Sequence, residues 1–171
     1  MTLAILWLAG FLVSLAFCTT SVLVARAVGA KIEHVAIFVG PPVSRLPVAG
    51  FRVLVGAVPV PGGHLTFEAA PTDDDPNRTQ LDDLSQGRRA AIFLFPWLAI
   101  ALATVVVLGP TVGLGAIGRG FVQFVAGAAS PTETGRTLVA TLFELARNAP
   151  FHVFASLVAT KMVAFNLLPL P

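Results

Sequence analysis

An uncharged apolar run near the start of the chain constrains its fold more than any other feature. Residues 3 to 25, LAILWLAGFLVSLAFCTTSVLVA, contain no charged side chain. A helix needs roughly 20 apolar residues to cross the bilayer core. A cleaved signal peptide would have a basic start and a shorter apolar core of about 7 to 15 residues. Because Met1 and Thr2 provide no basic start, the sequence predicts a retained transmembrane helix.

The composition agrees with a membrane protein. Of the 171 residues, 56% are hydrophobic and only 12% are charged, whereas soluble domains carry roughly 25% charged residues. The net charge of +2 is small and the basic residues are scattered, so no nucleic-acid partner is expected. The lipid bilayer is the expected surrounding of the apolar segments.

Two further segments are predicted to cross the membrane. Residues 90–113 contain no charge, and the helix there is expected either to span with tilt or to end early near Gly109-Pro110. Residues 151–168 are apolar except for His152 and Lys161. Lys161 is costly inside such a segment unless it snorkels, pairs or faces a polar cavity. Residues 119–150 between them are expected to include an interfacial or partly inserted helix. The expected fold is therefore an α-helical integral membrane protein with about three transmembrane helices.

A membrane-associated β-hairpin is expected within the first loop, over residues 50–68. Its sequence, GFRVLVGAVPVPGGHLTFE, has a β-branched run from Arg52 to Val60, a Pro-Gly-Gly turn and a second strand through Phe67. The free edge of such a hairpin can bind an extended peptide as an additional strand. The alternative is a hairpin that only packs against the helices, with its edge covered.

Short motifs in a fixed order resemble the site-2 protease family of intramembrane zinc metalloproteases. They are VARAVG at 24–29, the VGPP bend at 39–42, VPVPGG at 58–63 and NLLPLP at 166–171. In that family H-E-x-x-H precedes a V-A-R-x-x-G-type turn, and N-x-x-P-x-P precedes the Asp that is the third zinc ligand. The resemblance implies a single membrane domain over residues 1–171, in the bacterial inner (cytoplasmic) membrane.

The zinc-site residues of that family are missing from the corresponding positions. Counting back from VARAVG, H-E-x-x-H falls on residues 17–21, where Phe17, Cys18 and Ser21 replace the two ligands and the base. The motif needs two His one helical turn apart and a Glu to activate the zinc-bound water. The third ligand would follow Pro171. We therefore expect no catalytic, cofactor-binding or metal-binding residues, although the family resemblance would imply zinc.

The remaining candidate ligands have no spacing typical of a metal site. His34, His64 and His152 lie far apart in the sequence, and each is interpreted as a surface or interface histidine. Cys18 is the only cysteine, so it forms no intramolecular disulfide and is expected to be a buried thiol.

The sequence thus favours a catalytically inactive, site-2-protease-like protein that binds or regulates a membrane partner through a transmembrane or extended segment. A second hypothesis is a truncated or frameshifted intramembrane zinc peptidase, which the DNA beyond the codon for Pro171 would test. A third is an unrelated structural or transport-related membrane protein, in which Lys161 belongs to a pathway.

Overall fold

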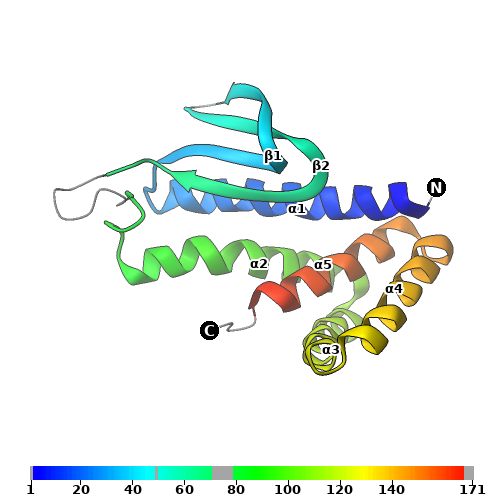
Figure 1. Ribbon diagram of the computed structural model, residues 1–171. Coiled ribbons are helices and arrows are strands. Elements are labelled where there is room, and N and C mark those ends of the chain that lie inside the picture. Colours follow the sequence, from blue (N-terminus) through cyan, green and yellow to red (C-terminus); the bar gives the residue numbers. More distant parts are fainter. Residues whose placement is uncertain (1, 49, 71–78, 168–171) are drawn as a thin grey trace. The chain divides into compact units, whose positions relative to one another are not determined.

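The computed structural model describes residues 2–48, 50–70 and 79–167, which form helices and one pair of long strands (Figure 1). The elements are α1 (Thr2–Ala27), β1 (Ile32–Val48), β2 (Phe51–Phe67), α2 (Gln86–Leu108), α3 (Pro110–Ala129), α4 (Pro131–Asn148) and α5 (Phe151–Leu167). A mostly helical chain with an antiparallel hairpin is what the sequence predicts. Two compact units result, Ser14–Pro96 and Met1–Val13 with Trp97–Pro171.

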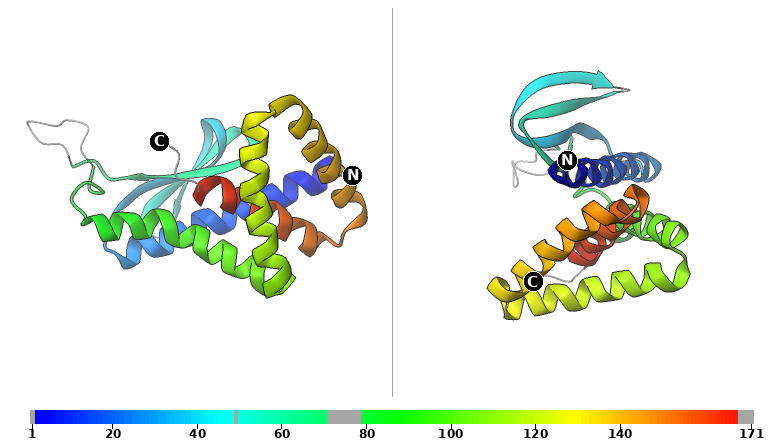
Figure 2. Two further views of the ribbon diagram at one scale, coloured as in Figure 1. Left: turned by 90° about the horizontal axis from the view of Figure 1, so that it is seen from below. Right: turned by 90° about the vertical axis from the view of Figure 1, so that its right-hand side faces the viewer.

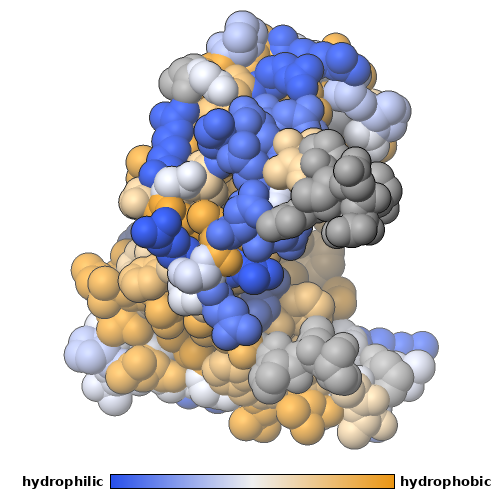
Figure 3. Space-filling model, turned by 90° about the vertical axis from the view of Figure 1, so that its left-hand side faces the viewer, coloured by the Kyte–Doolittle hydropathy of each residue, from blue (hydrophilic) through white to orange (hydrophobic). Residues whose placement is uncertain are grey.

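Three helices, α1, α2 and α3, are long and apolar enough to cross a membrane. Within their most apolar stretches only 33%, 22% and 17% of the residues are buried. An amphipathic helix of a soluble protein would turn its apolar face into the core and a polar face to water. Figure 3 shows broad hydrophobic areas on the surface, separated from a hydrophilic area. These features indicate a membrane protein.

The second apolar segment ends where a glycine and a proline interrupt it. The helix expected over 90–113 ends at Leu108, the earlier of the two predicted ends, because Gly109 adopts a φ of 80° and Pro110 begins α3. The third long apolar helix is α3, which includes the beginning of the segment expected to be interfacial. The helix expected over 151–168 is present as α5, which reaches the last described residue of the chain, Leu167.

A hairpin is present, but the prediction that residues 50–68 pair with themselves was wrong. Residues 51–67 form one strand, β2, which pairs with β1 instead of folding back on itself at Pro-Gly-Gly. The two strands meet near Gly50, which has a φ of 92°, since Val48 pairs with Phe51. Proline lacks a backbone donor and is tolerated only at edges and bulges, so the three prolines of β1 concealed this strand.

The first half of β1 lies between two segments of β2. His34 to Ile37 pair with Gly63–Thr66 on one side and with Arg52–Val55 on the other. β1 then bends at the predicted VGPP sequence, where Phe38 and Gly40 have positive φ values of 69° and 94°. Beyond the bend, β1 pairs only with the first half of β2.

Each unit has its own small core. In the Ser14–Pro96 unit, α1, β1 and α2 enclose a buried cluster of Cys18, Ala25, Ala30, Ile32, Val35 and Ile92. In the other unit, Ala9 of α1 packs with Ala146 of α4 and Phe154 of α5. Figure 2 shows α4 folding back from the end of α3 and leading into α5.

Candidate partner-binding sheet

Two of the residues that the motif resemblance aligns with H-E-x-x-H, Phe17 and Cys18, pack into the core between α1 and the sheet. Cys18 is 3% exposed, and its Sγ occupies the place where a Cβ on Gly63 would lie. Phe17 is half-buried and packs against the same core. Gly63 belongs to the VPVPGG motif, so this glycine allows β2 to approach α1 closely. The predicted burial of the Cys18 thiol is confirmed.

A buried face of α1 carries small polar side chains on either side of Cys18. Ser14 and Ser21 are 4% and 3% exposed. Neither hydroxyl oxygen has a hydrogen-bond partner within the described residues. Thr20 instead donates to the carbonyl of Ala16 at 2.7 Å. Ser21, which the resemblance aligns with the second ligand position of H-E-x-x-H, is thus a buried hydroxyl.

The sheet has two edges of different chemistry. One edge is the second half of β1, where Pro42 and Pro47 have no N–H to donate. The other edge is Gly63–Phe67, which contains no proline and pairs with β1 on one side. Within the described chain, no backbone group outside β1 hydrogen bonds to this segment. Gly63–Phe67 therefore has donors and acceptors available for an additional strand.

Exposed aliphatic side chains gather beyond the bend of the hairpin. They are 43% to 69% exposed and comprise Val39, Val43, Leu46, Val48, Val58 and Val60. Val39 and Val58 are paired across the strands, and exposed apolar side chains that cluster on a surface mark contact with another protein or with a membrane. The hairpin therefore combines an open backbone edge with an apolar surface.

Strand pairing brings together two histidines that are distant in the sequence. The rings of His34 and His64 lie 6.3 Å apart between centroids, in an edge-on arrangement. The Thr66 hydroxyl is hydrogen bonded to His34 Nε2 at 2.9 Å. Sequence spacing gave no sign of this pair, since β1 was not predicted. No three His, Cys, Asp or Glu side chains in the described parts of the chain are grouped as metal ligands.

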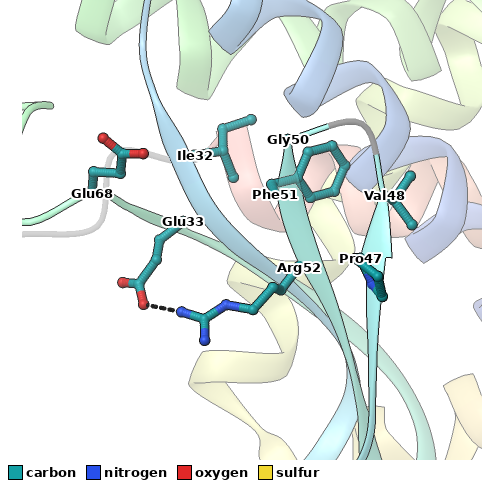
Figure 4. Close-up of a pocket in the computed structure, with 8 residues that line it drawn as sticks. All are labelled: Ile32, Glu33, Pro47, Val48, Gly50, Phe51, Arg52 and Glu68. Carbon is teal, nitrogen blue, oxygen red and sulfur yellow. Dashed lines mark hydrogen bonds and ion pairs between the residues drawn. The ribbon is translucent and has the colours of Figure 1, made fainter.

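The same sheet contains a pocket of about 440 Å³ at the end near the β1–β2 connection (Figure 4). Its apolar residues include Ile32 and Phe51, and its charged residues are Glu33, Arg52 and Glu68. Arg52 points towards Glu33 and donates a 2.7 Å hydrogen bond to its carboxylate. The pocket adjoins one end of the open edge, because Ile32 pairs with the last residue of β2 and Glu68 follows it.

The guanidinium of Arg26, in the VARAVG motif, holds the end of α1 against β2. Its Cζ lies 5.2 Å from the centroid of the Phe51 ring, a cation–π geometry. Two of the motifs that carry the family resemblance therefore connect α1 with the sheet, one through Arg26 and one through Gly63.

No protein-family model matches this chain, and no curated protein matches it. The likeness to site-2 proteases thus rests on the residues and order of the motifs alone.

Proposed function

We propose that this protein is a site-2-protease-like integral membrane protein, in a bacterial inner membrane, that binds an extended segment of a partner membrane protein without zinc-dependent cleavage. The partner segment adds to the Gly63–Phe67 edge of the sheet as a further strand. The observation that carries the proposal is this open, proline-free edge beside exposed aliphatic side chains. Backbone hydrogen bonds give affinity in this mode of recognition, and side-chain pockets give selectivity.

We propose no zinc-dependent cleavage because the residues aligned with the family's zinc motif cannot form its zinc site. Phe17 and Ser21 stand where the family has histidines, and Cys18 stands where it has the glutamate base. A hydrolytic zinc site needs about three protein ligands and an open position for water. The burial of Cys18 against Gly63 further favours a packing role for this part of α1.

Selectivity would come from the pocket at the end of the edge. An apolar side chain of the bound segment would meet Ile32 and Phe51, and a polar group would meet Glu33, Arg52 or Glu68. The Glu33–Arg52 ion pair holds both charged groups beside the pocket.

Site-specific photo-crosslinking in cells tests the proposal. A photoreactive residue replaces His64, which is exposed on the open edge, and in a matched control it replaces Arg45, which is exposed on the proline-bearing edge and lies outside the set of exposed aliphatic side chains. We expect a discrete crosslink to one membrane protein from position 64 and none from position 45. Mapping should place it in a segment flanking or within a transmembrane helix of that protein. Crosslinks to lipid alone from both positions would contradict the proposal.

A further inference from the structure

Helices α3 and α5 pack closely through small residues. A Cβ added to Gly120 would lie 2.8 Å from Ala164 Cβ and 3.4 Å from the Thr160 carbonyl oxygen. Thr160 and Ala164 are 0% and 1% exposed. Nearby, the rings of Phe124 and Phe165 meet edge-on with centroids 5.2 Å apart. The two helices are therefore held at a fixed crossing.

Two cationic side chains lie at this crossing. Lys161 Nζ donates a hydrogen bond to Gln123 Oε1, and Lys161 Cδ lies 3.8 Å from the Cβ position of Gly120. Arg119 lies on α3 one helical turn before Gln123, so the two side chains are on the same side of the helix, and its Nη1 lies 3.6 Å from the Cβ position of Gly115. Both Arg119 and Lys161 are exposed. Like charges held together by the backbone repel each other unless an anion compensates them.

No anion within the described residues provides this compensation. The carboxylates of Glu133 and Glu144, on α4, belong to the same unit. Neither they nor any other described carboxylate forms an ion pair with Arg119 or Lys161. The amide nitrogen of Gln123 remains available as a further donor.

The surface around these cations is apolar. Exposed apolar side chains of α3 and α5 include Val112, Leu114, Val122, Val125 and Phe165, of which Val122 lies one helical turn from Arg119 and Phe165 one turn from Lys161. Water does not compensate a charge on such a surface when lipid covers it. Ionisable residues in transmembrane segments are costly and pair with other groups. The missing anion must therefore come from outside the described chain.

We propose that Arg119, Gln123 and Lys161 form a docking site for a transmembrane helix of a partner protein that carries an Asp or Glu side chain. This inference rests on the membrane location in the proposed function and specifies the chemistry of the partner. Arg119 lies near the middle of α3, about 14 Å along the helix from either end. An acidic side chain at the same depth reaches this position, whereas a lipid headgroup lies at the membrane surface.

Binding of a designed helix to the full chain tests the docking site. The probe is a synthetic transmembrane peptide of leucine and alanine with one central Glu, and the matched probe has Gln instead. Both are measured by energy transfer in vesicles of zwitterionic phosphatidylcholine. We expect the chain to bind the Glu peptide about tenfold more tightly than the Gln peptide, because interhelical polar pairs contribute about 1–2 kcal/mol.

The variant Arg119→Gln/Lys161→Gln should lose this preference. The control Arg136→Gln/Arg147→Gln removes two exposed cations of α4 and should keep it. Circular dichroism verifies that both variants retain their helices. Equal binding of the two peptides to the unaltered chain would overturn the proposal, as would a preference that survives in the Arg119→Gln/Lys161→Gln variant.

Two further measurements distinguish a helix-docking site from a lipid site and from a chain outside the membrane. If phosphatidylglycerol displaces the Glu peptide and itself binds only when Arg119 and Lys161 are present, the site is for an anionic lipid and the proposal is wrong. Extraction of the chain from membranes by alkaline carbonate would refute the membrane location itself. Resistance to extraction combined with no preference for Glu would refute only the docking site.

Discussion

The close contact between Gly63 and Cys18 predicts a strong and specific steric coupling between β2 and α1. We expect Gly63→Ala to lower the free energy of unfolding by about 2 kcal/mol, in the range of other overpacked cores. Backbone strain does not contribute, because Gly63 has no positive φ value. The cost arises because the added methyl group meets Cys18 Sγ and lies 3.1 Å from the Ala36 carbonyl oxygen.

Removing the sulfur should relieve this cost. Cys18→Ala alone leaves a small cavity and should cost about 1 kcal/mol. In the double variant Gly63→Ala/Cys18→Ala, the new methyl group occupies the space of the missing sulfur. We expect the double variant to be less destabilised than the sum of the single variants by about 2 kcal/mol, within the range of coupling between contacting residues.

The assay is equilibrium unfolding in mixed micelles, followed by circular dichroism. Gly62→Ala is the matched control, because its Cβ would meet only Val39 Cγ2 at 3.9 Å and the Val60 carbonyl oxygen at 4.0 Å. Its stability should change by less than about 0.5 kcal/mol. A neutral Gly63→Ala, or additive costs in the double variant, would refute the close approach of β2 to α1.

Three other predictions rest on single features. Gly50→Ala forces alanine into a φ of 92° and should lower the free energy of unfolding by about 1 kcal/mol. Gly87→Ala, in a helix with open space around the added methyl group, should stabilise the protein slightly. Thermal melting of the two variants tests both expectations. Phe154→Ala removes a side chain that is 0% exposed and should cost about 3–5 kcal/mol in the same unfolding assay. Elemental analysis of the purified chain should find less than about 0.1 zinc per chain, and a value near one would contradict the proposed loss of zinc chemistry.

The helices α1 and α2 were predictable because lipid-facing segments need no alternating pattern, only length and the absence of charge. The same criterion missed α3, because Arg119 and Gln123 interrupt its apolar sequence. It also predicted α5, which is present over Phe151–Leu167. Charge is thus a poor guide to helix boundaries where polar residues of two helices meet.

The sheet was harder to predict because strand pairing depends on contacts remote in the sequence. Gly63 was interpreted as part of a turn, since a glycine needed for close packing looks the same as one needed for chain reversal. The pairing of His34 with His64 follows from a register that no local spacing reveals. Which edge stays open likewise depends on the whole sheet.

The central position of the first half of β1 also sets an order of events during synthesis. His34 to Ile37 need partners from residues 52–55 and 63–66, so the sheet closes only after the ribosome has made nearly all of β2. Until then Cys18 of α1 lacks Gly63 and the strand residues against which it packs. About 40 further residues must therefore be translated after the end of α1 before the sheet that packs against it is complete. At 5–20 residues per second this is a delay of seconds.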